Sequence, residues 1–119
     1  MDTGCKHMPI QGHRIEKKLS IEEVSVLLSN YNKKDVYCTN HTFFRLSEKQ
    51  RKVFKCQDII DYLVYKKPIF AAIQYNGNYA IFYKHKNESC IIRIMVDILP
   101  TKIDVITFYM INENQIPRL

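Results

Sequence analysis

The feature that most constrains the fold of this chain is a change of hydrophobic period at Pro68. Before Pro68, apolar residues recur every three or four positions, which is typical of amphipathic helices. After it they alternate with polar residues or form short apolar runs, as in β-strands. Because the helical part comes first and the strands follow, the pattern predicts an α+β fold. The 119 residues fit one domain. We expect a basic, partly mobile arm at 1–18 and a single α+β domain at 19–119.

Three helices are expected before Pro68. The first begins at Ser20, where Glu23 completes a capping box. The predicted helices span about 21–30, 41–52 and 57–65, and the second is open to a break near Ser47. We expect all three to pack on one face of a sheet.

Four strands are expected after Pro68, in an antiparallel meander. They span 69–75, 79–84, 90–99 and 102–111. Asn76-Gly77 predicts a two-residue type I′ turn that pairs Tyr75 with Asn78. Residues 35–39 are either a short strand or an extended connection.

The predicted register leaves one face of the sheet free of helices. Its expected residues are Gln74, Tyr79, Tyr83, Arg93, Thr107 and Tyr109, with Val105 on the same side of the last strand.

Charge favours an anionic partner. The formal net charge is +6 and the isoelectric point about 9.2, which points first to RNA, although many small proteins are basic without such a role. The four cysteines form no CxxC pair and are widely spaced, which argues against a zinc site. Without a secretory signal we expect no disulfide either, so all four should be ordinary thiols. No membrane-length apolar run or secretory signal is present, which predicts a cytoplasmic protein.

The segment from His41 to Arg51 is the leading candidate for chemistry. RNA cleavage without a metal needs a base, an acid and cations for the phosphate, roles suited to histidine and arginine, and tyrosines can stack on bases. The candidate catalytic residues are His41, Arg45, Arg51, Thr107 and Tyr109, and the candidate RNA-binding residues are Tyr79, Tyr83, Lys84 and Arg93.

Each of these residues also has a structural interpretation. His41 can be a helix-cap residue, the helix arginines can be solvated, and Arg93 can pair with Asp97 on the same strand face. The tyrosines can be half-buried packing residues. No metal-binding or nucleotide-binding motif is evident, so no cofactor is expected.

From His41 onward the sequence resembles a known pattern. It comprises His41-x-x-x-Arg45, Arg51, a helix with Ile59-Ile60, the run from Gln74 to Tyr79, and a terminal strand with Thr107. This is similar to small domains of the barnase–EndoU–colicin–RelE-like nuclease superfamily, which includes BrnT-like and RelE-like toxins.

The resemblance covers about two-thirds of the chain and implies helices packed on a four-stranded antiparallel sheet. It also implies metal-independent RNA cleavage. By position, His41 matches the helix histidine, Arg45 and Arg51 the helix basic residues, and Thr107 the last-strand hydroxyl. The first helix and the basic arm are additional to the pattern, and residues 53–56 lack its usual glycine-containing break.

The first functional hypothesis is therefore a ribonuclease toxin, neutralised by a protein antitoxin on its basic face. The second is a non-catalytic RNA- or protein-binding module that uses the same face. A third is an interaction protein with an exposed tyrosine-rich face. No membrane partner is expected, and homo-oligomerisation is left open.

Overall fold

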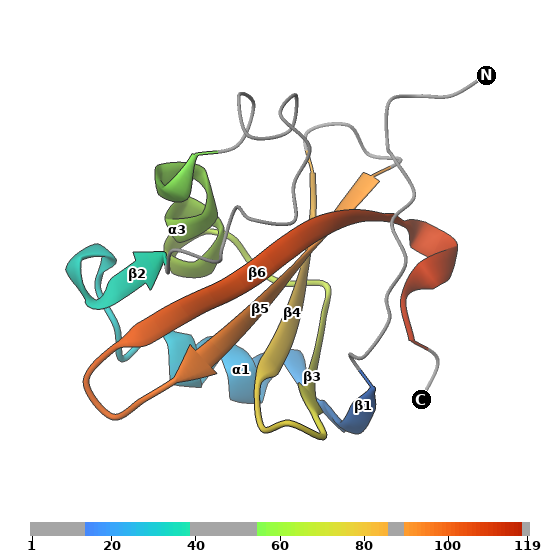
Figure 1. Cartoon of the computed structure of the whole chain (residues 1–119), viewed down its shortest axis with the longest axis horizontal. Coiled ribbons are helices and arrows are strands. Elements are labelled where there is room, and N and C mark those ends of the chain that lie inside the picture. Colours follow the sequence, from blue (N-terminus) through green and yellow to red (C-terminus); the bar gives the residue numbers. More distant parts are fainter. Residues whose placement is uncertain (1–13, 39–54, 86–89, 118–119) are drawn as a thin grey trace.

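The computed structural model describes residues 14–38, 55–85 and 90–117. They form a six-stranded sheet in the order β1-β3-β4-β5-β6-β2, with two α-helices (Figure 1). The elements are β1 (Ile15–Leu19), α1 (Ile21–Leu28), η1 (Lys33–Asp35), β2 (Val36–Cys38), α3 (Cys56–Tyr65), β3 (Phe70–Gln74), β4 (Tyr79–Lys84), β5 (Cys90–Ile98), β6 (Ile103–Asn112) and η2 (Glu113–Gln115). Neighbouring strands are antiparallel except β2, which runs parallel to β6.

The α+β class is confirmed, but three helices on a four-stranded antiparallel sheet is wrong. The described ranges contain two α-helices and a mixed sheet of six strands. The helix expected at 41–52 lies outside the described residues. The strand β1 is unexpected, because most of it belongs to the predicted basic arm, whereas β2 confirms the strand alternative for residues 35–39. Both strands are edges of the sheet. β1 carries three consecutive charged residues, and β2 is only three residues long, so neither has a clear apolar alternation.

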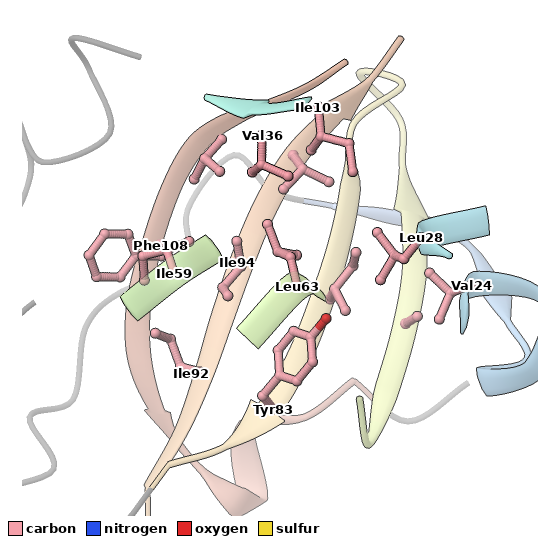
Figure 2. Packing of buried hydrophobic residues seen from close by; sticks show 14 of the residues in the cluster. Val24, Leu28, Val36, Ile59, Leu63, Tyr83, Ile92, Ile94, Ile103 and Phe108 are labelled. Atoms are coloured by element: carbon pink, nitrogen blue, oxygen red, sulfur yellow. The ribbon is translucent and has the colours of Figure 1, made fainter. Parts of the chain in front are cut away.

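Both helices pack on the same face of the sheet, called here the helix face. The capping box of α1 is confirmed, because Glu23 N donates to Ser20 Oγ at 3.0 Å and Ser20 N donates to Glu23 Oε1 at 3.1 Å. Val24 of α1 and Ile59 and Leu63 of α3 are buried against the sheet (Figure 2). The apolar stripes of the two amphipathic helices thus form one side of the hydrophobic core between the helices and the sheet.

The β3–β4 hairpin differs from its predicted register by one residue. Ile73 pairs with Tyr79, and the loop has three residues instead of two. Gly77 N donates to the Gln74 carbonyl at 2.9 Å, and Gly77 has φ +89°, the left-handed conformation that closes such a loop. Because side chains alternate, a one-residue shift moves every β4 side chain to the other face.

A bulge in β6 changes the predicted faces again. Met95 pairs with Thr107, but the next residue, Val96, pairs with Val105, so Ile106 is an extra residue on β6. Val105 therefore joins the helix-face core, although strict alternation along the strand predicts it on the same side as Thr107. Thr107 and Tyr109 stay on the other side of the sheet, called here the opposite face.

The expectation of four ordinary thiols is also wrong. Cys38, the last residue of β2, forms a disulfide with Cys56, the first residue of α3, and their Cα atoms are 6.0 Å apart. Cys90 is a buried thiol, as expected, and Cys5 lies outside the described residues. The expectation rested on the lack of a recognisable secretory signal, and the spacing of cysteines in the sequence does not report how close they lie in the fold.

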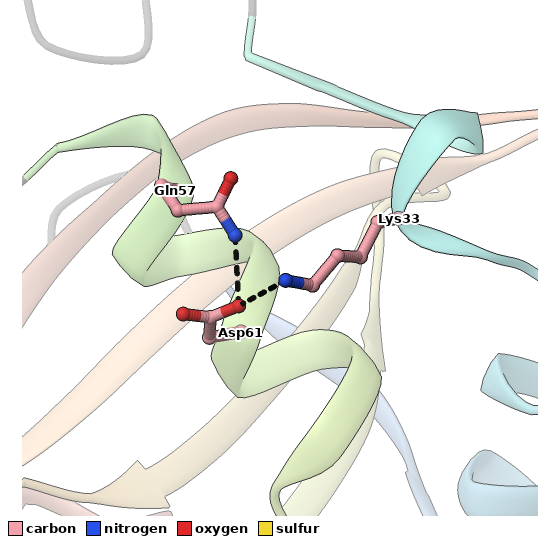
Figure 3. Close-up of polar contacts among 3 residues, drawn as sticks. All are labelled: Lys33, Gln57 and Asp61. Atoms are coloured by element: carbon pink, nitrogen blue, oxygen red, sulfur yellow. Dashed lines mark hydrogen bonds and ion pairs between the residues drawn. The ribbon is translucent and has the colours of Figure 1, made fainter.

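The side of α3 next to η1 is held by polar contacts. Lys33 Nζ lies 3.3 Å from Asp61 Oδ1, which also accepts a 2.8 Å hydrogen bond from Gln57 Nε2 (Figure 3). The hydrogen bond to Asp61 raises the pKa of Lys33, although both groups are exposed and such pairs add little stability. These contacts orient the segment that enters β2. No helix in the described ranges is long and apolar enough to span a membrane.

Candidate functional site

The most unusual polar group of the opposite face is the side chain of Arg93, in the middle of β5. It is 1% exposed and is among the largest fully buried side chains of the described residues. Its Nη2 donates to Gln74 Oε1 at 3.3 Å, and its Nε lies 3.3 Å from Met95 Sδ. The guanidinium carbon lies 5.1 Å from the ring centroid of Phe82 and 6.0 Å from that of Tyr109. We call these five residues and Thr107 the arginine cluster.

The sheet register explains why these side chains meet. Arg93 pairs directly with Phe82 on β4 and with Tyr109 on β6, so an aromatic ring stands on each side of it. Ala72 of β3 and Ala80 of β4 pair with each other, and the side chain of each is only a methyl group. The long arginine side chain therefore has room to reach toward Gln74.

Arg93 keeps a positive charge in this apolar setting. Burial lowers its pKa, and Tyr109 acts in the opposite direction. Arginine has so high an ordinary pKa that it stays protonated at neutral pH. Ring faces and an amide oxygen attract a guanidinium group, which reduces the cost of its burial.

Thr107 contributes a second unusual group to the cluster. It is 6% exposed, and its Oγ1 is buried and has no hydrogen-bond partner in the part of the chain that the structure describes. Leaving such a hydroxyl unsatisfied costs about 1–3 kcal/mol. Buried polar atoms without partners are rare and frequently mark functional sites.

The predicted free face is therefore only partly right. Gln74, Arg93, Thr107 and Tyr109 do share one face, as expected from strand alternation. That face is not open, however, because Arg93, Thr107 and Tyr109 are all buried. Ile15, Ile69 and Ile116 pack at its margin. Its side chains form a second core cluster in place of an exposed platform.

Two predicted RNA-binding tyrosines lie on the other side of the sheet. Tyr79 and Tyr83 belong to the helix-face core, because the hairpin register differs from the predicted one. Figure 2 shows Tyr83 among the residues between the sheet and the helices. Its hydroxyl is buried without a partner among the described residues, and burial raises its pKa. Lys84, at the end of β4, is exposed.

A histidine contact that the sequence did not predict lies beside Tyr83. Tyr62 of α3 and His85 are joined by a 2.8 Å hydrogen bond between Tyr62 Oη and His85 Nδ1, and the rings of Tyr62 and Tyr83 are 5.4 Å apart. Burial raises the pKa of Tyr62, and Asp58 adds to this effect. His85 follows the last residue of β4, and only the packing of α3 brings the two side chains together.

The predicted catalytic residues His41, Arg45 and Arg51 lie outside the described residues. In the sequence, all three fall between the disulfide partners Cys38 and Cys56.

The suggested pairing of Arg93 with Asp97 is not seen. The two residues are four positions apart on β5, about 13 Å along the strand. Arg93 contacts Gln74 and Met95, and Asp97 lies opposite Asp104 on β6.

Within the described ranges, no three histidine, cysteine or acidic side chains come together as a metal site. Comparison with family models, with curated proteins and with solved structures finds no match. A function for this chain therefore has to be inferred from its own residues.

Proposed function

We propose that this protein is a metal-independent ribonuclease that acts on single-stranded RNA. The observation that carries the proposal is the arginine cluster, in which a buried cation lies on the same sheet face as the buried, unpartnered hydroxyl of Thr107. Tyr109 stands beside Arg93. Such a combination suits a phosphate, because arginine donates to its oxygens and a hydroxyl adds a further donor.

The proposed reaction is an internal transesterification. A base removes the proton of the ribose 2′-hydroxyl, whose oxygen attacks the adjacent phosphorus. The bond from phosphorus to the 5′-oxygen breaks, and an acid protonates the leaving oxygen. The products are a 2′,3′-cyclic phosphate and a 5′-hydroxyl end. His41 is the proposed base or acid, and Arg45, Arg51 and Arg93 are the proposed phosphate ligands.

Burial of the cluster supports a second candidate, a non-catalytic RNA-binding protein. In this conformation Arg93 is 1% exposed, so RNA reaches it only if the covering residues move. A charge of +6 supports salt-dependent RNA binding without cleavage equally well. A protein antitoxin that covers the basic face belongs to the proposal of a ribonuclease toxin, and the RNA-binding candidate does not need one.

The cytoplasmic location stays a proposal, and the disulfide weighs against it. Disulfides are rare in reducing cytosol and common in oxidising compartments. A toxin that is exported from its producer would reconcile the Cys38–Cys56 bond with an intracellular RNA target.

The deciding experiment is cleavage of a labelled single-stranded RNA with and without EDTA. We expect cleavage that EDTA does not abolish, and cyclic-phosphate ends on the products. His41→Ala and Thr107→Val should each reduce the rate at least tenfold, a loss typical for a removed catalytic group. Tyr83→Phe is the matched control, because it also deletes a buried, unpartnered hydroxyl but on the helix face.

Binding of RNA without any cleavage would replace the ribonuclease proposal by the RNA-binding one. Equal rates for the Thr107→Val and Tyr83→Phe proteins would remove the arginine cluster from the mechanism.

A further inference from the structure

A groove of about 510 Å³ lies where β2 meets β6, apart from the arginine cluster. It is lined by Tyr37, Cys38, Thr101, Lys102 and Asp104. Tyr37 pairs with Asp104 in the parallel β2–β6 register, which puts both side chains on the same side of the sheet. The volume is in the range of small-molecule sites.

Tyr37 offers an aromatic surface to this groove. The residue is 53% exposed and lies in the middle of the edge strand β2. Lys102 Nζ lies 5.9 Å from the centre of the ring, close enough for a cation–π contact. An exposed ring beside a lysine is the arrangement that binds a base and its phosphate in single-stranded RNA.

Lys102 and Asp104 place a donor and an acceptor side by side. Lys102 Nζ lies 3.4 Å from Asp104 Oδ2, and the Asp104 side chain keeps 21% of its surface exposed. An ammonium group only donates hydrogen bonds and a carboxylate only accepts them. The Watson–Crick edge of guanine presents the complement, an acceptor at O6 followed by donors at N1 and N2. Uracil presents one donor between two carbonyl oxygens, which a carboxylate repels.

We propose that this groove is a nucleobase subsite for single-stranded RNA, with guanine as the preferred base. Tyr37 stacks on the base, Asp104 accepts hydrogen bonds from N1 and N2, and Lys102 donates to O6 or to the adjacent phosphate. The inference rests on the proposed function as far as RNA is the ligand, and it adds the position and the sequence preference of the bound strand.

The groove lies on the same side of the sheet as the arginine cluster. Asp104 precedes the β6 bulge and Thr107 follows it, and neither belongs to the helix-face core, whereas Val105 and Phe108 do. Asp104 and Thr107 are three positions apart on β6, about 10 Å at most. An RNA strand with one base in the groove therefore points along β6 toward the cluster, which it reaches only if the residues that bury Arg93 and Thr107 move.

Tyr75 provides a matched control. It is 64% exposed and has Arg14 over its ring at 5.5 Å, but it lies in the β3–β4 loop instead of beside this groove. If any exposed tyrosine with a cation on its ring binds RNA, Tyr37 and Tyr75 should be equivalent. If the groove is the subsite, only Tyr37 should matter.

The test is fluorescence anisotropy with two labelled oligonucleotides on the disulfide-bonded full chain. One is all uridine and the other has a single central guanosine, and both carry 2′-O-methyl groups that prevent transesterification. We expect the guanosine oligonucleotide to bind about tenfold more tightly. Tyr37→Leu should weaken its binding about tenfold or more, the loss typical of one stacked base. Tyr75→Leu should leave the binding unchanged.

Asp104→Asn tests the base preference separately. The amide can donate as well as accept, so we expect the two oligonucleotides to bind within about threefold of each other, without loss of the folded state in a thermal melt. Equal effects of Tyr37→Leu and Tyr75→Leu, or an unchanged guanosine preference in the Asp104→Asn protein, would overturn the subsite. So would absence of binding by the unmodified chain.

The outcomes separate this inference from the ribonuclease proposal. Cleavage that depends on Thr107 but not on Tyr37 would support the ribonuclease proposal and contradict the subsite. Guanosine-selective binding without cleavage of unmodified RNA would support the subsite and contradict the ribonuclease proposal.

Discussion

Removing the Cys38–Cys56 disulfide should destabilise this protein by about 3 kcal/mol. The bond closes a loop of 18 residues between β2 and α3. In the chain-entropy model, a crosslink of this length lowers the unfolded-state entropy by roughly 11 cal/mol/K, which is about 3 kcal/mol at 25 °C. Unfolding entropy near 60 °C is about 2.1 cal/mol/K per residue, so 119 residues give about 0.25 kcal/mol/K. The melting temperature should therefore fall by roughly 12 °C.

The assay is thermal unfolding by circular dichroism, with and without a reductant, on the wild type and on the Cys38→Ala/Cys56→Ala double variant. We expect reduction to lower the wild-type melting temperature to a value near that of the double variant. The double variant is its own control, because the reductant should not change it. A shift below about 4 °C in both comparisons would refute the reasoning, and it would mean that the strand β2 and helix α3 are held by packing alone.

Three further changes have expected effects on stability. Thr107→Val should raise the free energy of unfolding by about 1 kcal/mol or more in urea titrations, since it removes a buried hydroxyl without a partner; a loss would mean that this hydroxyl is bonded in solution. Gly77→Ala should cost about 1–2 kcal/mol from its φ of +89° alone, because an added Cβ meets no atom within 4 Å, and Gly77→Asn should cost less. Ser20→Ala should cost about 1 kcal/mol through the lost cap of α1. The pKa of Glu23 is lowered by its bonds with Ser20, so acidification through that lowered pKa should reduce the difference between wild type and Ser20→Ala.

Local signals predicted the elements that depend on local chemistry. The capping box at Ser20 and the apolar stripes located α1 and α3 to within two residues at each end. The alternation after Pro68 located β3 to β6, because a half-buried strand repeats every two residues. Strand alternation also grouped Arg93 with Tyr109 across β5 and β6.

The candidate site was predicted less completely, because it depends on register. Asn76-Gly77 is compatible with a two-residue or a three-residue loop, and the choice between them moved Tyr79 and Tyr83 to the helix face and brought Phe82 to Arg93. Only interactions across the whole sheet select one register.

The sequence alone determined the α+β fold class, the starts of the two helices, the central strands and the positive charge. These features follow from composition and from residues that are neighbours in the chain. Tertiary structure alone decided the edge strand β1, the pairing of β2 with β6, the bulge at Ile106, the Cys38–Cys56 bond and the burial of Arg93. Each of these depends on residues far apart in sequence that become neighbours only when the sheet assembles. A strand as short as β2 has almost no pattern of its own, and its position is set by the β6 backbone with which it pairs.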